Sequence, residues 1–445
     1  MPNQTNTRRR FLALSGAATV AGLAGCMGTD SDASENGGNG SSDENGDGNE
    51  STSYGPPELQ VETEYDSREE FEQPGEQFDN FEDLDPWEVV QGSAEADEDV
   101  VFDGSQSLRL SAEDSENVVV ERRIDTTDMS DLELSMAVRT STPSNIAIDI
   151  RLIDIYGGYA HHQLRSVTYR DSDPGWFRTN PGVFEESSMP LERDVVEEIQ
   201  IIVYNTDDEA EVWVDDMRIH EKPEKGYVVL CWDDGVEDFY DTASPLHDEY
   251  GVNAVQAAVR QWTRNQRDGI MTVAQLKERQ EAGDQIVAHG THTQFAEMDE
   301  ADLRDALRRD KNWAVQNEFE GGHYIVYPHN SFDQTVLDVV SDYYYAGGFN
   351  QSGNVNLTGV HGFDPLALPR TIGHDLDISL RAVDLAAKHR QCTILNFHAF
   401  DQDNTLDEGE YEQLLEHIQS RGDDVEVIDF DDLWTMRREG HRPDN

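Results

Sequence analysis

The sequence reads Tyr227-Val-Val-Leu-Cys-Trp-Asp-Asp-Gly235 where an apolar, β-branched segment runs directly into two carboxylates and a glycine. Such a segment is typical of a buried strand, and Gly235 permits a sharp turn after it. In repeating βα folds, ligands bind at the carboxyl ends of the strands, because several strands deliver side chains into one crevice there. Neighbouring side chains of an extended chain point to opposite faces, so Asp233 and Asp234 can divide two roles, holding a cation and accepting a proton.

Strand and helix patterns alternate after Lys222, which predicts a parallel sheet, either open or closed into a barrel. Helix signals include capping boxes at Thr272-x-x-Gln275 and Ser331-x-x-Gln334 and a helix from Val273 to Ala282. The apolar segments expected to form strands are Val228–Cys231, Ala254–Val259, Gln285–Ala288, Tyr324–Tyr327, Tyr344–Ala346, Leu366–Leu368 and Cys392–Phe397.

The region from residue 57 to residue 222 has a different pattern. Apolar and polar residues alternate in short segments, turn residues separate these segments, and helical spacing is almost absent. This pattern predicts a β-sandwich. The runs 104–110 and 212–219 are similar to early and last strands of jelly-roll carbohydrate-binding modules. Trp87, Trp176 and Trp213 either stack on sugars or belong to the core.

A structural calcium ion is a further expectation for this sandwich. Asp215 or Asp216, together with Asp79 or Glu82, offers the oxygen ligands that calcium prefers. Carboxylates are so frequent in this chain that their presence alone does not decide the matter.

The first 26 residues have the order of an export signal: Arg8-Arg9-Arg10-Phe11-Leu12, an apolar stretch too short to span a bilayer, and Leu23-Ala24-Gly25-Cys26. The arginines resemble a twin-arginine signal and the ending resembles a lipobox, which implies lipidation of Cys26. A cleaved signal with an incidental cysteine is the alternative. Residues 27–56 are dominated by Ser, Asp, Glu, Asn and Gly, which predicts a disordered acidic linker.

Acidic residues dominate the composition, with 92 Asp and Glu against 33 Lys and Arg and a formal net charge of −59. A nucleic acid or another polyanion meets repulsion from such a surface, so we expect no nucleic-acid partner. The excess of acid resembles that of proteins from salt-saturated environments, where salt screens self-repulsion, and predicts a halophilic protein. The remaining cysteines, Cys231 and Cys392, lie in apolar runs and are expected to be buried thiols.

Three later strand ends carry histidines, in the runs Ile286-Val-Ala-His289-Gly-Thr-His292, Val326-Tyr-Pro-His329-Asn330 and Ile394-Leu-Asn-Phe-His398. Two histidines and one carboxylate leave open positions on a divalent ion for water and a substrate oxygen. The second carboxylate and a distant histidine can then act as base and acid. The sequence thus predicts a hydrolytic metal site, with zinc as the expected ion.

The region 226–434 resembles the polysaccharide deacetylase (NodB homology) family of carbohydrate esterases. Cys231-Trp-Asp-Asp-Gly235 stands where the family has Thr-Phe-Asp-Asp-Gly, and Ile394 to His398 matches its last strand and Leu-x-x-His. The resemblance implies a deformed (β/α) barrel, Asp233 as general base, Asp234 and His289 as metal ligands, and His398 as general acid.

Two positions depart from the family pattern. The second family histidine normally follows the first by four residues, whereas position 293 is Thr and the available imidazole is His292. A turn shortened by one residue makes His292 the third ligand. The Arg-Pro-Pro-Tyr-Gly loop is also absent, and Arg370 is the candidate to supply its guanidinium to the base.

The sequence therefore predicts a multi-domain chain: an N-terminal all-β jelly-roll sandwich, residues 57–222, and a C-terminal α/β deformed (β/α) barrel, residues 223–445. Its expected function is metal-dependent hydrolysis of N- or O-acetyl groups on sugars of a polysaccharide, at the cell surface and anchored by lipid. The alternative is a non-catalytic carbohydrate-binding lipoprotein with a degenerate barrel. The residues expected to line the substrate groove are Trp232, Tyr327, Pro328, His329 and Asn330.

Overall fold

The computed structural model describes residues 73–439, except 114–115, 166, 169–171, 208, 291–292 and 401–404, and omits the side chains of 349–351. The predicted signal and linker, including Cys26, lie outside the described residues, and so does His292. No helix in the described part of the chain is long and apolar enough to cross a membrane.

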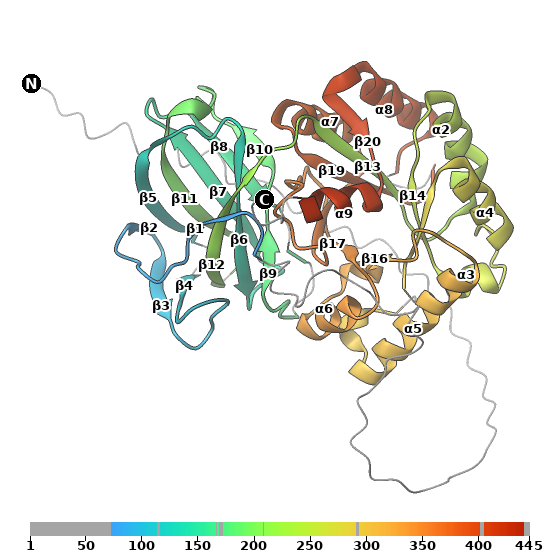
Figure 1. The fold of residues 1–445 in the computed structure, drawn as a ribbon, viewed down its shortest axis with the longest axis horizontal. Coiled ribbons are helices and arrows are strands. Elements are labelled where there is room, and N and C mark those ends of the chain that lie inside the picture. Colours follow the sequence, from blue (N-terminus) through green and yellow to red (C-terminus); the bar gives the residue numbers. More distant parts are fainter. Residues whose placement is uncertain are drawn as a thin grey trace, which may run out of the picture. The chain divides into compact units, whose positions relative to one another are not determined.

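Two antiparallel sheets form the N-terminal domain (Figure 1). One has the strand order β3-β4-β12-β6-β9, with β1 beside β12, and the other has the order β10-β8-β7-β11-β5-β2. The strands of the first sheet are β1 (Glu76–Asp79), β3 (Ser93–Asp97), β4 (Ser107–Glu113), β6 (Leu132–Thr140), β9 (Phe177–Thr179) and β12 (Glu209–Glu221). Those of the second are β2 (Trp87–Gln91), β5 (Val118–Thr127), β7 (Ile146–Asp154), β8 (Tyr159–Leu164), β10 (Val183–Glu186) and β11 (Val196–Asn205).

The core of the sandwich comes from alternate residues of facing strands, such as Ile199, Ile201 and Val203 on β11, which are fully buried. Trp87 and Trp213 are each 8% exposed, so both rings belong mainly to the interior.

The carboxylates considered for calcium are occupied by protein donors. Asp216 forms an ion pair with Arg178, and Asp79 accepts a hydrogen bond of 2.8 Å from the indole N–H of Trp87. Calcium at these positions stays a prediction.

Parallel strands form the C-terminal sheet, in the order β14-β15-β16-β17-β18-β19-β13-β20. Pairing of β13 with β14, at Cys231 with Val255, closes β13 to β19 into a barrel. The strands are β13 (Gly226–Trp232), β14 (Val255–Ala258), β15 (Gln285–Ala288), β16 (Tyr324–Val326), β17 (Ala346–Ser352), β18 (Leu368–Ile372), β19 (Cys392–Phe397) and β20 (Val425–Val427). The prediction of an all-β sandwich followed by a deformed (β/α) barrel is confirmed.

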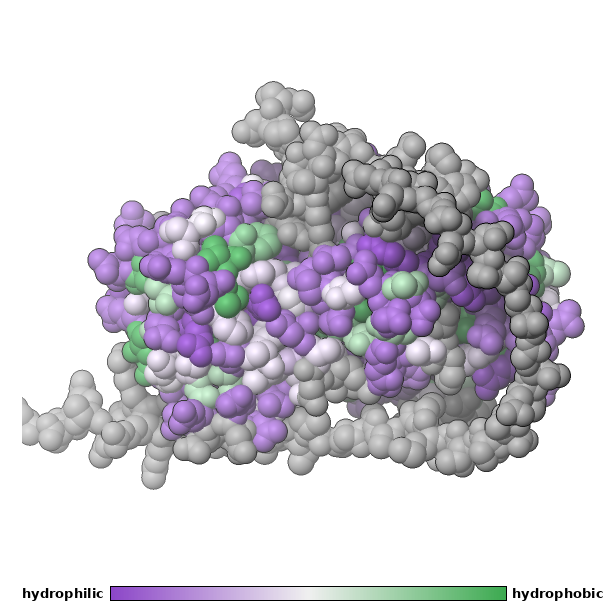
Figure 2. All heavy atoms as spheres, turned by 90° about the horizontal axis from the view of Figure 1, so that it is seen from below, coloured by the Kyte–Doolittle hydropathy of each residue, from purple (hydrophilic) through white to green (hydrophobic). Residues whose placement is uncertain are grey.

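Helices cover the outside of the barrel (Figure 1), with α7 against β13 and β19, and α4 and α5 against β15. They are α2 (Ser244–Tyr250), α3 (Arg260–Arg264), α4 (Val273–Ala282), α5 (Glu300–Gln316), α6 (Gln334–Ser341), α7 (Leu376–His389), α8 (Glu408–Ser420) and α9 (Phe430–Glu439). Short helical turns span Arg193–Val195, Phe239–Ala243, Phe295–Glu297, Pro328–Asn330 and Gly422–Asp424. On the face drawn in Figure 2, hydrophilic side chains cover most of the described surface.

Alternate side chains of a barrel strand belong to two different hydrophobic cores, one inside the barrel and one between the strands and the helices. On β13, Val229 and Cys231 belong to a cluster shared with the other barrel strands, whereas Val228, Leu230 and Trp232 pack with residues of the surrounding helices. Odd-numbered residues of β13 therefore face the barrel interior, and this parity places Asp233 at the mouth of the barrel.

Candidate active site

The same parity explains how four separate strands deliver side chains to one place. On β13, β15, β18 and β19, a polar residue stands two or four positions after an interior apolar residue. Because side chains alternate along a strand, this polar residue points to the same side as the interior residue. The pairs of interior residue and mouth residue are Cys231 with Asp233, Val287 with His289, Leu368 with Arg370 and Ile394 with His398. Because the strands are parallel, their carboxyl ends open on one rim.

The two carboxylates after β13 reach the same site because the backbone turns between them. The φ angle of Asp234 is 70° and that of Gly235 is 69°. Left-handed backbone is uncommon for residues other than glycine, although Asp tolerates it better than most, and such strain is frequent at functional sites. The turn brings Oδ1 of Asp234 to 3.4 Å from Nε2 of His289, beside the Asp233 carboxylate.

Asp233 is a buried carboxylate with a fixed countercharge. It is 2% exposed, and Nη1 of Arg370, itself 1% exposed, lies 2.9 Å from its Oδ1 and 3.2 Å from its Oδ2. Burial alone would raise the pKa of Asp233, but Arg370 and then His289 and His398 outweigh burial and hold this pKa well below its usual range. Asp233 is therefore ionised at neutral pH.

His289 has a defined tautomer. Its Nδ1 lies 3.0 Å from the carbonyl oxygen of Val326, which can only accept, so Nδ1 carries the proton and Nε2 of the neutral ring has a lone pair. Burial alone would lower the pKa of His289, but Asp233 and Asp234 outweigh burial and the net shift is upward. The imidazole lone pair thus faces two carboxylates, an arrangement that suits a bound cation.

These donors fit a divalent metal ion. Ligand atoms on a tetrahedral ion with bonds of about 2.1 Å lie about 3.4 Å apart. The Asp234 Oδ1 and His289 Nε2 atoms are separated by 3.4 Å. No cluster of three His, Cys, Asp or Glu side chains suited to a metal is found among the described residues, a set that does not include His292.

His398 also lies near Asp233, and it has a partner that the sequence does not predict. Its Nε2 lies 3.9 Å from Asp233 Oδ2, and its Nδ1 lies 3.2 Å from Nε2 of His374. Burial and the neighbouring His398 lower the pKa of His374 to about 4, so His374 is neutral at pH 7. His374 follows β18 by two residues, and the only sequence signal for it was its place just after the strand that carries Arg370.

The residues predicted to line the substrate groove lie in different environments. The Trp232 ring is 1% exposed and packs among aromatic rings, with its N–H donating to the Tyr411 hydroxyl at 3.2 Å. Tyr327 is also buried, and its hydroxyl donates to the carbonyl of Leu366. Neither ring is on the surface, so contact of either ring with a sugar requires that neighbouring side chains move.

The turn after β16 contains two residues with left-handed backbone. His329 and Asn330 have φ angles of 58° and 52°. His329 is exposed, whereas Pro328 and Asn330 are buried. Asn330 is 2% exposed, and neither polar atom of its side chain has a hydrogen-bond partner among the residues that the structure describes. A buried amide of this kind is costly.

Residues 220–348 match the family model described as Polysaccharide deacetylase. The match contains Asp233, Asp234, His289 and the turn at His329, and it ends before Arg370 and His398. The part of the C-terminal domain that carries Asp233, Asp234 and His289 is thus similar to this family. Among curated proteins, none is significantly similar to the chain.

Several solved structures resemble part of the chain. A Streptococcus pyogenes deacetylase in complex with acetate is 15% identical over 42% of this chain and 69% of its own, with a TM-score of 0.29. Two family 4 carbohydrate esterases are also similar. The one from Streptomyces lividans in complex with acetate is 13% identical over 44% of this chain and 90% of its own (TM-score 0.30), and that from Bacillus anthracis is 16% identical over 48% and 84% (TM-score 0.32). TM-scores this low carry no weight for the activity.

Proposed function

We propose that the barrel is a metal-dependent deacetylase that hydrolyses N- or O-acetyl groups from sugars of a surface or environmental polysaccharide. One observation carries this proposal: a buried, ionised carboxylate, Asp233, stands between a candidate metal-ligand pair and a histidine that can donate a proton. The match of residues 220–348 to the polysaccharide deacetylase family supports the same chemistry.

Asp234 and His289 would hold the ion, with His292 as the predicted third ligand. Zinc is the expected metal, because imidazole and carboxylate donors suit it. When bound, such an ion polarises an acyl oxygen and lowers the pKa of a coordinated water. Arg370 keeps the adjacent Asp233 charged and fixed in direction, so that the base stays separate from the ligand Asp234.

Two proton transfers complete the reaction. Asp233 takes the proton of the attacking water, and His398 delivers a proton from Nε2 to the departing sugar nitrogen or oxygen. The products are acetate and the free amine or hydroxyl. In this step His374, neutral at pH 7 and with its Nε2 3.2 Å from Nδ1 of His398, would accept a hydrogen bond from His398 and keep its ring in the orientation needed to donate. His374 is thus a positioning residue.

Acetate release from an acetylated oligosaccharide, measured in molar salt, tests the proposal. Asp233→Asn should abolish release while keeping bound metal, whereas Asp234→Asn should lower metal affinity. Asp268→Asn removes an exposed carboxylate and should change neither. Release that survives in Asp233→Asn would contradict the assignment of the base.

The role of His374 has its own test. His374→Ala should lower kcat roughly tenfold or more and leave KM unchanged, because His398 loses the partner that orients it. His374→Gln supplies an amide oxygen as acceptor and should restore much of kcat. Equal losses in both variants would mean that His374 serves packing only.

The competing function is that of a non-catalytic carbohydrate-binding lipoprotein. Thr293 stands where the family has its second histidine, and this observation favours a degenerate site. Metal stoichiometry separates the two functions. About one tightly held ion per chain, lost in both His292→Ala and Asp234→Ala, supports the enzyme. A chain that stays empty when divalent ions are added supports the binding protein.

We further propose that the chain is exported and anchored by a lipid on Cys26, with residues 27–56 as a tether and the sandwich as a carbohydrate-binding module. The order of arginines, apolar run and cysteine supports this proposal. Cys26→Ser should move the protein from the membrane fraction to the medium. A protein that stays in the membrane fraction after this change would refute the lipid anchor.

A further inference from the structure

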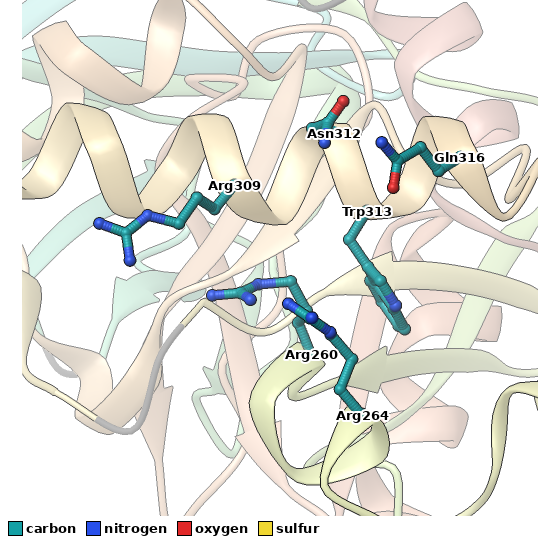
Figure 3. Close-up of a pocket in the computed structure, with 6 residues that line it drawn as sticks. All are labelled: Arg260, Arg264, Arg309, Asn312, Trp313 and Gln316. Carbon is teal, nitrogen blue, oxygen red and sulfur yellow. The ribbon is translucent and has the colours of Figure 1, made fainter.

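A cavity of about 200 Å³ lies between α3 and α5, close to the carboxyl end of β14. Arg260 and Arg264 extend into it from α3, and Arg309 and Trp313 extend toward them from α5 (Figure 3). The residues that line this arginine pocket are Arg260, Arg264, Arg309, Asn312, Trp313 and Gln316.

The charge of the arginine pocket is opposite to that of the chain. The sequence has 33 basic and 92 acidic residues, yet the lining contains three arginines and no acid. Arg260 forms an ion pair with buried Asp310, and Arg309 pairs with Asp305 at the helix surface. Arg264 forms no ion pair with any residue that the structure describes. At least one guanidinium is therefore available to an anion.

The lining also suits a sugar. Guanidinium groups bind carboxylates and sulfates through paired, charge-assisted hydrogen bonds. The side-chain amides of Asn312 and Gln316 can donate to and accept from hydroxyl groups. A polar pocket with this combination recognises an anionic sugar better than a neutral one.

The pocket lies near the catalytic residues along β14. The carbonyl of Ala258, the last residue of β14, accepts a hydrogen bond of 3.1 Å from the N–H of His289. The α-carbon of Ala258 would be 3.5 Å from a β-carbon added at Gly235, so the strand end also adjoins the turn after Asp233. Arg260 follows Ala258 by two residues.

Charges from the arginine pocket and from the candidate active site both act on Asp310. Burial raises the pKa of Asp310, and Arg260, Arg309 and His289 each oppose this rise. Asp310 is therefore within the field of both the pocket arginines and the candidate metal-binding histidine. The carboxyl end of β14 therefore adjoins the turn after Asp233 and is followed directly by the arginines of the pocket.

We propose that the arginine pocket is a subsite for an anionic group, a carboxylate or a sulfate, on a sugar next to the one that is deacetylated. This inference rests on the proposed deacetylase function. The composition led us to expect that the acidic surface repels polyanions. In molar salt, however, repulsion by surface charges is screened beyond about 3 Å. A substrate anion can then approach, and the short contacts with arginine persist.

Calorimetric binding and acetate release with the full chain in molar salt test the subsite. The probes are an acetylated oligouronate, its neutral methyl ester, and an acetylated sulfated oligosaccharide. The uronate or the sulfated sugar should bind roughly ten- to a hundredfold more tightly than the methyl ester, because a charged hydrogen-bonded contact is lost with the ester. Whichever anion shows this preference is the group that the pocket takes.

Arg264→Gln and Arg309→Gln should remove the preference for the anionic probe and leave affinity for the methyl ester and kcat unchanged. Arg308→Gln, on the same helix but outside the lining, is the matched control and should change nothing. Equal affinity of all probes for the wild type, or equal losses for charged and neutral probes in Arg264→Gln, would overturn the subsite.

The two proposals fail in different ways. Anion-dependent binding without acetate release from any probe would refute the deacetylase and leave an anionic-sugar binding site. Acetate release from charged and neutral probes with equal KM would refute the subsite and leave the deacetylase.

Discussion

The ion pair between Arg370 and Asp233 should contribute more to stability than any surface ion pair of this protein. Arg370→Met keeps much of the side-chain volume but leaves Asp233, 2% exposed, without its guanidinium. Removing one partner of a buried ion pair typically costs about 3–5 kcal/mol, because the other charge stays buried. The Nε2 atoms of His289 and His398, each 3.9 Å from Asp233 Oδ2, compensate in part. We therefore expect a loss of about 3 kcal/mol.

Urea unfolding in molar salt, followed by tryptophan fluorescence, measures this loss as a change in midpoint with an unchanged slope. Arg308→Met is the control, because Arg308 and Asp305 are 49% and 36% exposed and such pairs contribute less than about 1 kcal/mol. In a double-mutant cycle, Asp233→Asn should recover much of the stability that Arg370→Met loses. A loss below about 1 kcal/mol, or strict additivity of the two substitutions, would refute this account of the site.

Further predictions concern the fold. Trp232→Phe should lower the free energy of unfolding by about 1–2 kcal/mol, because it removes the hydrogen bond to Tyr411 and leaves a small void; an unchanged urea midpoint would contradict this. Burial lowers the pKa of His247 to about 3 in the folded chain. Between pH 6.5 and about 3 the unfolded chain therefore binds one more proton than the folded chain. As the pH falls through this range, the free energy of unfolding should decrease by about 1.4 kcal/mol per pH unit because of this group. His247→Gln should give a shallower decline, and equal slopes would refute the assignment. Stability should also rise from low to molar salt, given the net charge of −59, and a flat dependence would rule out self-repulsion.

Local patterns predicted most of the elements of the barrel. The strand before Asp233 and the helix from Val273 to Ala282 appear where expected, and Thr272 forms the predicted capping box with Gln275. These features depend on residues a few positions apart. Alternation on each strand then fixes which side chains reach the barrel mouth, because the interior face continues past the last core residue.

Two local predictions were wrong: the residue that caps α6 and the bounds of the strand at Leu368. The Ser331 capping box does not form: Asp333 caps α6, accepting a hydrogen bond of 2.8 Å from the N–H of Val336. The strand predicted to end at Leu368 instead begins there and continues to Ile372. Pro369 looked like a strand end, since proline lacks a backbone donor, but its neighbours still pair within the sheet.

The partners within the site could not be read from the sequence. Arg370 and Asp233 are 137 positions apart, and nothing local links them. Arg370 was a candidate only because the family loop with its arginine is absent. The hydrogen bond between His374 and His398 was not foreseen at all, because it depends on how β18 and β19 lie beside each other.

The charge of the whole chain and the charge of its barrel mouth act over different distances. Exposed charges in molar salt are screened beyond about 3 Å, so the acidic surface hardly affects a ligand before contact. Arg370 and Asp233 are buried and 2.9 Å apart, and salt does not screen a pair from which water is excluded. The guanidinium groups of the arginine pocket likewise act on a group that enters the pocket. A surface adapted to salt can therefore change without altering the chemistry at the mouth, and the net charge of such a protein does not predict the charge of its substrate.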